Sequence, residues 1–573
     1  MGAQTGTRVD SSTVGLVIGP LGFLAILISP VGVQWPTPWL LAVGTLLCVV
    51  GLVGLLAGGG RRWLVLAASA AITIGVVVAI VPLLHGMPPV ARKTLAVTVW
   101  MATWWMTLAI PIPATSLLPL VLFPVLGVLT SSATAANYAN DIIFLFLGGF
   151  ILALGIQRWG LHRRIALHVV HRIGTNPMRT VLGFMMATAF LSMWISNTAT
   201  TLMMLPIALA VIASMREVAG GVRLGGFAPA LLLGIAYSAS IGGLATPIGT
   251  PPNIAFLRVQ EILYPQAPTI SFGRWFVCFL PLVLLFLPIA WWLLTRVVHR
   301  LERGAVGSGA AVIGDQLRAL GAMRPAEKRM AWIFLTTAVL WITRGDLDLG
   351  AIHLPGWAGL VERGLGLEDF SSHLHDATIA MAMALLMFVL PGDRGDSGEP
   401  CRLMQWETAR RLPWGILLLF GGGFALAQAF KDSGLSQFMG EAFAGRVQHL
   451  HPILLVASVC VLLTFLTEVT SNTATTQVML PVLAGAAGAM GVNPLLLMIP
   501  ATLSASCAFM LPIATPPNAI VFGSSEIEMR QMIRAGLLLN LVGVVLVTLV
   551  FYFLTAPLLG LDLSTVPVWA VGR

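Results

Sequence analysis

Leu-Ser-Met-Trp-Ile-Ser-Asn-Thr at residues 191–198 and Leu-Thr-Glu-Val-Thr-Ser-Asn-Thr at residues 466–473 are two versions of one polar motif. Each version lies in an apolar segment, and each is followed later by Thr-Pro-Pro-Asn, at residues 250–253 and 515–518. The same two elements in the same order indicate an internal duplication. Polar, helix-breaking residues within apolar segments are typical of a binding site inside a membrane. The motifs therefore predict one central site built from two matching halves.

The composition is that of an integral membrane protein. Of the 573 residues, 57% are hydrophobic and 10% are charged, whereas roughly a quarter of the residues of a soluble domain are charged. Apolar runs of about 20 residues, the length of a membrane-crossing helix, recur from Val14 to Phe553. The alternation expected of a membrane β-barrel is absent from the sequence. We therefore expect an all-α polytopic membrane protein embedded in a lipid bilayer.

The excess of positive charge fits a membrane topology better than a nucleic-acid partner. The net charge is +9, but the Lys and Arg residues gather in short loops beside the apolar segments, as in cytoplasmic loops of membrane proteins. The five cysteines are scattered without a CxxC pair, so the sequence indicates neither a disulfide framework nor a metal site.

Thirteen apolar segments are long enough to be predicted as membrane spans. The first is expected to stay as an anchor, because it is too long for a signal-peptide core and another span follows at once. The predicted spans are 14–33, 39–58, 63–84, 94–111, 113–130, 140–156, 226–257, 272–298, 329–344, 376–392, 413–430, 493–522 and 531–556.

The two segments that carry Ser-Asn-Thr, 180–216 and 451–490, are too long for one span and are predicted to enter the membrane and return. The arginine-rich stretches 157–179 and 214–224 flank the first segment, and both can be cytoplasmic only if that segment is a re-entrant hairpin. The acidic loop 345–375 then falls outside, and the second hairpin enters from the opposite face. This arrangement is an inverted repeat. It places the N-terminus in the cytoplasm and the C-terminus outside an inner (cytoplasmic) membrane, although Arg92 and Lys93 then lie outside, against the charge rule.

The chain is accordingly divided into two repeats with an N-terminal addition. Each repeat is expected to hold one hairpin and one broken helix. The predicted parts are extra N-terminal helices (1–62), the first helices of repeat one (63–130), its hairpin-bearing part (140–257, with broken helix 226–257), a closing helix (272–298), a cytoplasmic linker (299–328), the first helices of repeat two (329–392), its hairpin-bearing part (413–522, with broken helix 493–522) and a last helix (531–556).

The hydroxyls and amides of the two motifs suggest Na⁺ ligands. Ser192 precedes Ser196 by four residues, and Thr467 precedes Ser471 by four, so each pair would share one helix face. Hydroxyl, amide and freed carbonyl oxygens are hard ligands of the kind that unwound transporter helices offer to Na⁺. The alternative is that these residues only bond to the helix backbone or hold helices together, which explains one copy better than two.

The two Thr-Pro-Pro stretches are predicted to break their helices. Adjacent prolines remove two backbone donors and clash with the preceding turn, which would free the carbonyls of Gly249 and Ala514. In a membrane such groups need an internal partner or a bound ion. A plain proline kink explains one break but not the repeated pairing with a hairpin.

Neither motif contains a cationic side chain, so an anionic substrate would be neutralised by co-bound cations and helix N-termini. Glu468 is the one acid beside a motif. It is either a functional intramembrane carboxylate or the acceptor of a structural hydrogen bond, since Met193 holds its place in the first copy. His162, His168 and His171 are expected on an interfacial amphipathic helix. His373, His375 and Asp376 are expected to cap the next span rather than bind a metal.

With these motifs the chain resembles the divalent anion/Na⁺ symporter family, the dicarboxylate and citrate transporters, over about residues 63–556. Ile-Gly-Thr-Pro-Pro-Asn at 248–253 and Met-Leu-Pro-Ile-Ala-Thr-Pro-Pro-Asn at 510–518 carry the resemblance together with the Ser-Asn-Thr pair. It implies a homodimer in which a mobile transport domain (140–257 and 413–522) moves as an elevator against a scaffold (63–130 and 329–392). It also implies one Na⁺ site at Ser192, Ser196, Asn197 and Gly249, and a second at Thr467, Ser471, Asn472 and Ala514. The implied substrate contacts are Ser196, Asn197, Thr198, Thr250, Ser471, Asn472, Thr473, Thr515 and Pro516.

The expected function is Na⁺-coupled uptake of a divalent anion, with C4-dicarboxylates such as succinate, fumarate and malate first and citrate or sulfate second. Na⁺-independent exchange is the alternative. An intramembrane enzyme is not indicated, because the sequence holds no HExxH and no Ser/Lys or Asp pair within the spans. Co-transported Na⁺ is the only cofactor expected.

Overall fold

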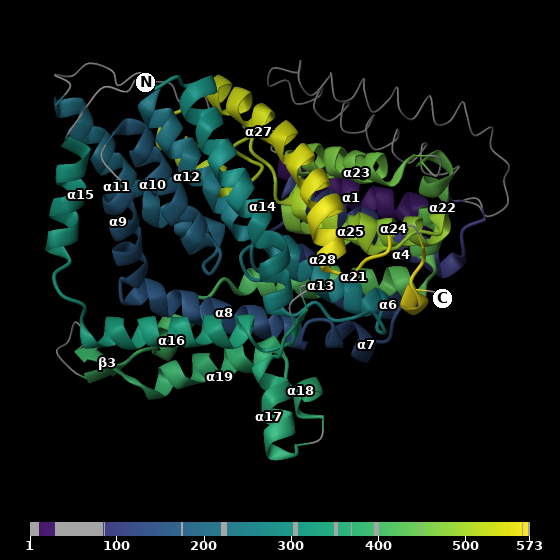
Figure 1. Cartoon of the computed structure of the whole chain (residues 1–573). Coiled ribbons are helices and arrows are strands. Elements are labelled where there is room, and N and C mark those ends of the chain that lie inside the picture. The colour runs from purple at the N-terminus through teal and green to yellow at the C-terminus, as the bar shows by residue number, and fades with distance from the viewer. Residues whose placement is uncertain are drawn as a thin grey trace, which may run out of the picture.

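The computed structural model is built almost entirely of helices (Figure 1). It describes residues 11–28, 84, 86–173, 176–218, 226–301, 308–348, 353–367, 369–394, 400–447, 450–563 and 565–570. The predicted span 39–58 and nearly all of 63–84 lie outside the described residues. Five described helical segments are long and apolar enough to cross a membrane: Ser131–Arg158, Asn197–Arg216, Phe272–Val298, Trp414–Asp432 and Met529–Leu558.

The N-terminal group is made of one helix pair and three short helices. Helix α1 packs along α4, and the indole N–H of Trp104 donates to the carbonyl of Gly15 at 2.8 Å. Residues 113–130 form short helices instead of the single predicted span. The bounds are α1 Ser11–Ile28, α4 Pro89–Thr107, α5 Ile112–Thr115, α6 Leu118–Leu126 and α7 Ser131–Ala136.

The first half continues with seven helices. Asn140 caps α8, and Asn176 caps α10 through its side-chain oxygen, which satisfies N–H groups that a helix start leaves free. The buried side of α9 is apolar and its other side carries the basic residues, as an amphipathic helix requires. The bounds are α8 Asp141–Arg158, α9 Leu161–Ile173, α10 Pro177–Ser192, α11 Asn197–Val218, α12 Phe227–Gly243, α13 Pro251–Leu263 and α14 Phe272–Trp292, which runs on as a π-helical turn Leu293–Val298.

The connecting region carries two small β-hairpins besides its helices. Leu347 pairs with Leu354 in the first hairpin, and Pro391 pairs with Arg402 in the second, both antiparallel. The bounds are α15 Ser308–Ala319, α16 Pro325–Ile342, β1 Leu347–Asp348, β2 His353–Leu354, α17 Trp357–Leu365, α18 Phe370–His373, α19 Asp376–Val389, β3 Pro391–Arg394, β4 Pro400–Arg402 and α20 Trp406–Ala409.

The second half repeats the order of the first. A long helix is followed by a shorter one, by two helices around Ser-Asn-Thr, by two helices around Thr-Pro-Pro, and by a long closing helix. The bounds are α21 Trp414–Asp432, α22 Leu435–Val447, α23 Pro452–Thr467, α24 Asn472–Met490, α25 Leu495–Ala505, α26 Pro516–Phe522, α27 Met529–Val550 with a π-helical turn Phe551–Thr555, α28 Ala556–Leu558 and a 3₁₀ turn Val568–Ala570.

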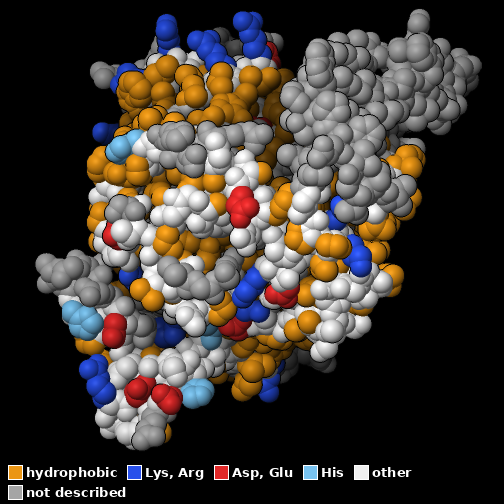
Figure 2. Space-filling model, turned by 90° about the vertical axis from the view of Figure 1, so that its right-hand side faces the viewer, with side chains coloured by type: hydrophobic (Ala, Val, Ile, Leu, Met, Phe, Trp, Pro, Cys, Tyr) orange, Lys and Arg blue, Asp and Glu red, His pale blue; other side chains and the backbone are white. Residues whose placement is uncertain are grey.

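Three helices, α8, α16 and α19, lie side by side, and α17 projects from them (Figure 1). Helices α8 and α19 approach very closely, because a Cβ on Gly148 would lie 2.6 Å from the Cβ of Ala380. Figure 2 shows a broad field of hydrophobic side chains on the upper part of one face, with Lys and Arg side chains at its upper rim. A lipid-facing surface bounded by basic residues has this appearance.

Candidate functional site

The helix breaks stand at the motifs that the sequence singled out. Helix α10 ends at Ser192 and α11 begins at Asn197; α23 ends at Thr467 and α24 begins at Asn472. The prediction that Ser192 and Ser196 share one helix face is therefore wrong, as it is for Thr467 and Ser471. The helix stops between the two members of each pair, so the four-residue spacing no longer places them one turn apart.

Both motifs and both Thr-Pro-Pro stretches line one cavity of about 770 Å³. The structure thus brings together all nine residues that the sequence proposed as substrate contacts, although their roles stay predictions. The nine are Ser196, Asn197, Thr198, Thr250, Ser471, Asn472, Thr473, Thr515 and Pro516. Ala514 also lines the cavity, whereas Ser192 and Thr467 are fully buried behind it.

In the first half, four oxygen-bearing groups converge behind the cavity wall. The hydroxyl of Ser192 donates to the carbonyl of Ala239 at 2.7 Å. One atom of the Asn197 amide lies 2.6 Å from that hydroxyl and 3.0 Å from the carbonyls of Ala239 and Gly249. With its nitrogen inward, the amide donates to all three groups. With its oxygen inward, four hard oxygens face one another, which is the environment that Na⁺ requires.

The second half has the same arrangement around Thr467. Its hydroxyl lies 2.6 Å from Asn472 Oδ1 and donates to the carbonyl of Ala505 at 3.1 Å. The helices that follow are tied in the same way, because Thr201 donates to the carbonyl of Asn197 at 2.8 Å and Thr476 to that of Asn472 at 2.7 Å. The contacts of the Ser192 and Thr467 hydroxyls therefore correspond, because each reaches the amide at the start of the next helix and one backbone carbonyl.

The adjacent prolines begin new helices rather than kinking old ones. Pro251 and Pro516 are the first residues of α13 and α26, a position where a missing N–H costs nothing, and Thr250 and Thr515 are the extended residues before them. A Cβ on Gly249 would lie 2.5 Å from the carbonyl oxygen of Gly243. Only glycine therefore fits at residue 249, where the segment before α13 lies against the end of α12.

Sequence reasoning missed the residues that hold the breaks in shape. Asn253 donates to the carbonyls of Gly243 and Thr246 at 3.1 and 2.8 Å. Asn518 donates to the carbonyls of Ala508 and Leu511, both at 3.1 Å. Each asparagine thus bonds to carbonyls that precede its own helix. The signal was present, since both residues end the quoted Thr-Pro-Pro-Asn motif, but their partners could not be inferred from spacing.

Glu468 is buried and anchors the second break. Its carboxylate accepts the backbone N–H groups of Phe509 (2.8 Å), Met510 (2.9 Å) and Leu511 (3.0 Å), and the amide of Asn540 at 2.7 Å. All four partners are donors, so the contacts suit a carboxylate. They are structural hydrogen bonds, but they reach outside the hairpin, to the stretch before Thr515 and to α27. In the first half Met193 occupies the position that corresponds to Glu468, and its backbone carbonyl accepts a hydrogen bond from the hydroxyl of Thr246.

The cavity has an electropositive character without cationic side chains. None of its lining residues within the described ranges is Arg, Lys, His, Asp or Glu. Besides the short α5 at Ile112, four helices nevertheless begin at residues that line it: Asn197, Pro251, Asn472 and Pro516. The N-terminus of a helix carries a partial positive charge and N–H groups without helical partners, although the paired prolines remove the first two of these N–H groups from α13 and α26. The carboxyl ends of α10, α12, α23 and α25 supply the carbonyls behind it, so anion-attracting and cation-attracting groups lie next to each other.

Residues 62–561 match the model of a known protein family, the sodium:sulfate symporter transmembrane region. The chain belongs to this family. It is 43% identical over 474 residues to the sodium-dependent dicarboxylate transporter SdcS of Staphylococcus saprophyticus, which covers 82% of this chain and 87% of that protein. SdcS of Staphylococcus aureus is equally similar, with the same identity and coverage.

A solved structure supports the fold. The crystal structure of the Alcanivorax borkumensis YdaH transporter aligns with a TM-score of 0.50 at 16% sequence identity, covering 76% of this chain and 89% of that chain. At this identity the similarity concerns the fold alone. A polytopic, helical fold is thus supported both by the chain's own apolar helices and by a solved structure of similar fold.

Proposed function

We propose that this protein couples the inward flux of Na⁺ to the uptake of a divalent anion, a C4-dicarboxylate such as succinate, fumarate or malate. The observation that carries the proposal is the single cavity onto which two oxygen clusters and four helix N-termini converge. The names of the 43% identical relatives point to the same pair of solutes. Their similarity extends over most of both chains, so the proposal does not rest on one domain.

The roles of the residues follow from their positions. Ser192, Ser196, Asn197 and Gly249 would hold one Na⁺, and Thr467, Ser471, Asn472 and Ala514 a second. Rotating the Asn197 amide would convert a hydrogen-bonded cluster into a set of oxygen ligands. The carboxylates of the substrate would then meet the hydroxyls of Thr198, Thr473, Thr250 and Thr515, the amides of Asn197 and Asn472, and the N-terminus at Pro516.

This arrangement makes anion affinity depend on Na⁺. With no cationic side chain lining the cavity, two negative charges would enter a low-dielectric site that only helix N-termini make positive. Bound Na⁺ would supply the missing field, and by linkage each solute would raise the affinity for the other. Glu468 would act indirectly, by holding the chain between Phe509 and Leu511 in place beside the second cation.

We further propose an inverted repeat with two re-entrant hairpins, α10–α11 and α23–α24, and two broken helices, α12–α13 and α25–α26. The equal order of elements in the two halves supports it. These eight helices would be the mobile part of an elevator in a homodimer in the inner membrane. Helix α8 packs along α19, so we assign it to the scaffold, although the sequence had grouped residues 140–257 together.

The cavity is proposed to open to the cytoplasm. Its lining includes Gln157 and Pro413, which stand beside the basic residues Arg158, Arg410 and Arg411, and basic ends of spans favour the cytoplasmic side. The structure would then be the inward-open state, with the N-terminus inside and the C-terminus outside.

Uptake by proteoliposomes tests the proposal. Radiolabelled succinate, citrate and sulfate would be offered in sodium buffer and in choline buffer. We expect succinate uptake that needs Na⁺ and is competed by fumarate and malate. Equal succinate uptake in the two buffers would identify a Na⁺-independent exchanger, and faster citrate or sulfate uptake would reassign the substrate.

A further inference from the structure

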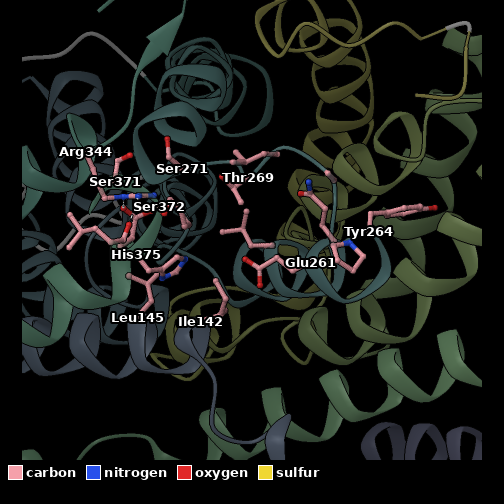
Figure 3. A pocket seen from close by; sticks show the side chains of 18 residues that line it. Ile142, Leu145, Glu261, Tyr264, Thr269, Ser271, Arg344, Ser371, Ser372 and His375 are labelled. Carbon is pink, nitrogen blue, oxygen red and sulfur yellow. Dashed lines mark hydrogen bonds and ion pairs between the residues drawn. The ribbon is translucent and has the colours of Figure 1, made fainter. Parts of the chain in front are cut away.

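Charged side chains of three helices meet beside a second pocket, of about 190 Å³, which Glu261 and His375 line (Figure 3). Asp141 begins α8, His375 precedes α19, and Arg258 and Glu261 lie near the end of α13. Arg258 Nη1 lies 3.0 Å from Glu261 Oε2 and 3.9 Å from Asp141 Oδ1, and His375 Nε2 lies 3.8 Å from Asp141 Oδ2. Figure 3 shows His375 and Glu261 on opposite sides of the pocket.

This group does not fit a metal site, although one carboxylate oxygen of Asp141, one of Glu261 and one ring nitrogen of His375 lie within 4.8 Å of one another. His375 Nδ1 accepts the backbone N–H of Ala377 at 3.1 Å, as the cap of α19 that the sequence predicted. The ring proton is therefore on Nε2, which leaves no lone pair for a metal there. Arg258 is already paired with Glu261 and lies near Asp141, so a cationic side chain occupies the space beside the two carboxylates.

The group connects two bodies with different packing. Asp141 and His375 belong to α8 and α19, which approach closely at Gly148 and Ala380. Arg344 Nε lies 2.5 Å from Asp376 Oδ1 and ties α16 to the same body. Helix α13, by contrast, packs on α24 and α25 of the proposed mobile part, and also on α21, and has few contacts with α8. The ion pair between Arg258 and Asp141 therefore bridges the part that we propose to be static and the part that we propose to be mobile.

The group also lies at the far end of α8 from the cavity opening. The cavity is lined by Phe150 to Gln157 in the second half of α8, whereas Asp141 is the first residue of that helix. At 1.5 Å per residue, about 24 Å of helix separates Asp141 from Gln157. While one end of this helix faces the open cavity, the other is fastened to α13.

From these contacts we infer that Asp141, Arg258, Glu261 and His375 form an outer latch that holds α13 against α8 and α19 while the cavity is open on the opposite face. The inference rests on the proposed transport cycle and adds to it the residues that stabilise one of its two end states. Opening toward the outside requires α13 to leave Asp141, so the latch must break once in every cycle. Lys431, whose ammonium group donates to the carbonyl of Ile262 at 2.6 Å, stabilises the same end of α13 from α21.

Two cysteine pairs test the latch, in a protein whose five native cysteines have been replaced by alanine. Asp141→Cys with Glu261→Cys would link α8 to α13, and the control Asp141→Cys with His375→Cys would link α8 to α19 within one body. A short bifunctional thiol reagent is applied, followed by succinate uptake. We expect the first link to lower uptake at least tenfold, with recovery on reduction, and the control link to change it less than twofold.

A second readout does not depend on the substrate. A third cysteine replaces Ile513, which lines the cavity and is 78% exposed, in each of the two paired variants. After cross-linking, this cysteine is labelled with an impermeant maleimide from each membrane face. The 141–261 link should leave labelling from the cytoplasmic face and abolish it from outside. Labelling from outside in the linked protein, or equal effects of both links, would overturn the latch. Loss of Na⁺-dependent uptake in the unlinked protein, with labelling as expected, would overturn the proposed function alone.

Discussion

Ser192 Oγ lies 2.6 Å from Asn197 Oδ1, across the gap where one helix ends and the next begins. The pair Thr467 and Asn472 has the same distance in the second half. A hydroxyl at the carboxyl end of one helix and an amide at the start of the next thus enclose the carbonyls of a broken helix in both halves. Two such enclosures on one cavity are what a transporter that binds two cations and an anion together would need.

Replacing either amide should raise the Na⁺ requirement. Asn197→Ala or Asn472→Ala removes one proposed ion ligand, and the loss of one hydrogen bond or ligand contact to a charged group is expected to raise the Na⁺ concentration for half-maximal succinate uptake by about tenfold. Gln428→Ala is the matched control, because that amide contacts only Asp432 among the hydrogen bonds of the described residues. Unchanged Na⁺ dependence in both variants would count against the assignment.

Neutralising Glu468 should destabilise the second half. In Glu468→Gln an amide nitrogen would face backbone N–H groups, and each buried hydrogen bond to a charged group that is lost costs about 1.5–3 kcal/mol. We expect a lower melting temperature in detergent and a weaker Na⁺ response. Glu441→Gln makes the same chemical change on α22, where the side chain contacts only Gln437. Equal melting temperatures of the two variants would contradict the anchoring role.

The asparagines after the prolines should matter for transport and not only for folding. Asn518→Ala removes two hydrogen bonds to the carbonyls of Ala508 and Leu511, at a cost of about 1–3 kcal/mol. We expect a maximal uptake rate several-fold below that of the wild type in protein that still elutes as a single species. Asn518→Asp, which keeps an acceptor but not the donor, should be as impaired; normal uptake by Asn518→Asp would show that the donated bonds are dispensable.

The open ends of the two hairpins should face opposite sides of the membrane, although their tips share one cavity. Single cysteines at Arg179 and His451, both exposed at the starts of α10 and α23, should react with an impermeant maleimide from the cytoplasmic and the outer face respectively. Reaction of both positions from one face under all conditions would argue against inverted hairpins.

Mild acidification should close the outer latch. Burial, helped by the charge of Asp141 and opposed by Arg258, raises the pKa of Glu261 to about 7, so the latched state binds a proton that the solvated carboxylate at its ordinary pKa of 4.5 does not. This contribution is lost as the pH rises through 7 and grows as the pH falls. Burial lowers the pKa of His375 against the charges of Asp141 and Asp376, with Arg344 and Arg258 adding to the lowering, so this group opposes the latch increasingly as the pH falls toward 6.5 and has little effect near pH 8.

Between pH 8 and 7 the outer labelling of Ile513→Cys, expressed as a ratio to its cytoplasmic labelling so that ionisation of the thiol itself cancels, should therefore fall by up to about twofold. Glu261→Gln should abolish the change, because that side chain does not titrate. Arg363→Gln on α17 serves as a charge control away from the pocket. Outer labelling that rises as the pH falls through this range would contradict the assigned sign.

Much of the site could be predicted from the sequence because it repeats. Two copies of Ser-Asn-Thr and of Thr-Pro-Pro-Asn located the residues that line the cavity, and hydropathy predicted an all-helical membrane protein. The ends of the helices could not be predicted, so Ser196 was placed on the helix of Ser192. The partners of Glu468, Phe509 to Leu511 and Asn540, lie 41 to 72 residues along the chain and follow only from tertiary packing. The contacts of the outer latch could not be predicted for the same reason, because its residues come from three segments that share no motif.

The contact between Glu468 and Asn540 also constrains the order in which this protein can be made. Residue 468 leaves the ribosome before residue 540, so the carboxylate has none of its four donors when its hairpin is first offered to the translocation machinery. Burying an unpaired charge in lipid is strongly unfavourable. The second hairpin must therefore wait in a polar environment until residues 509–511, which supply three of the four donors, have been synthesised, and the carboxylate gains its last partner only when Asn540 of α27 follows.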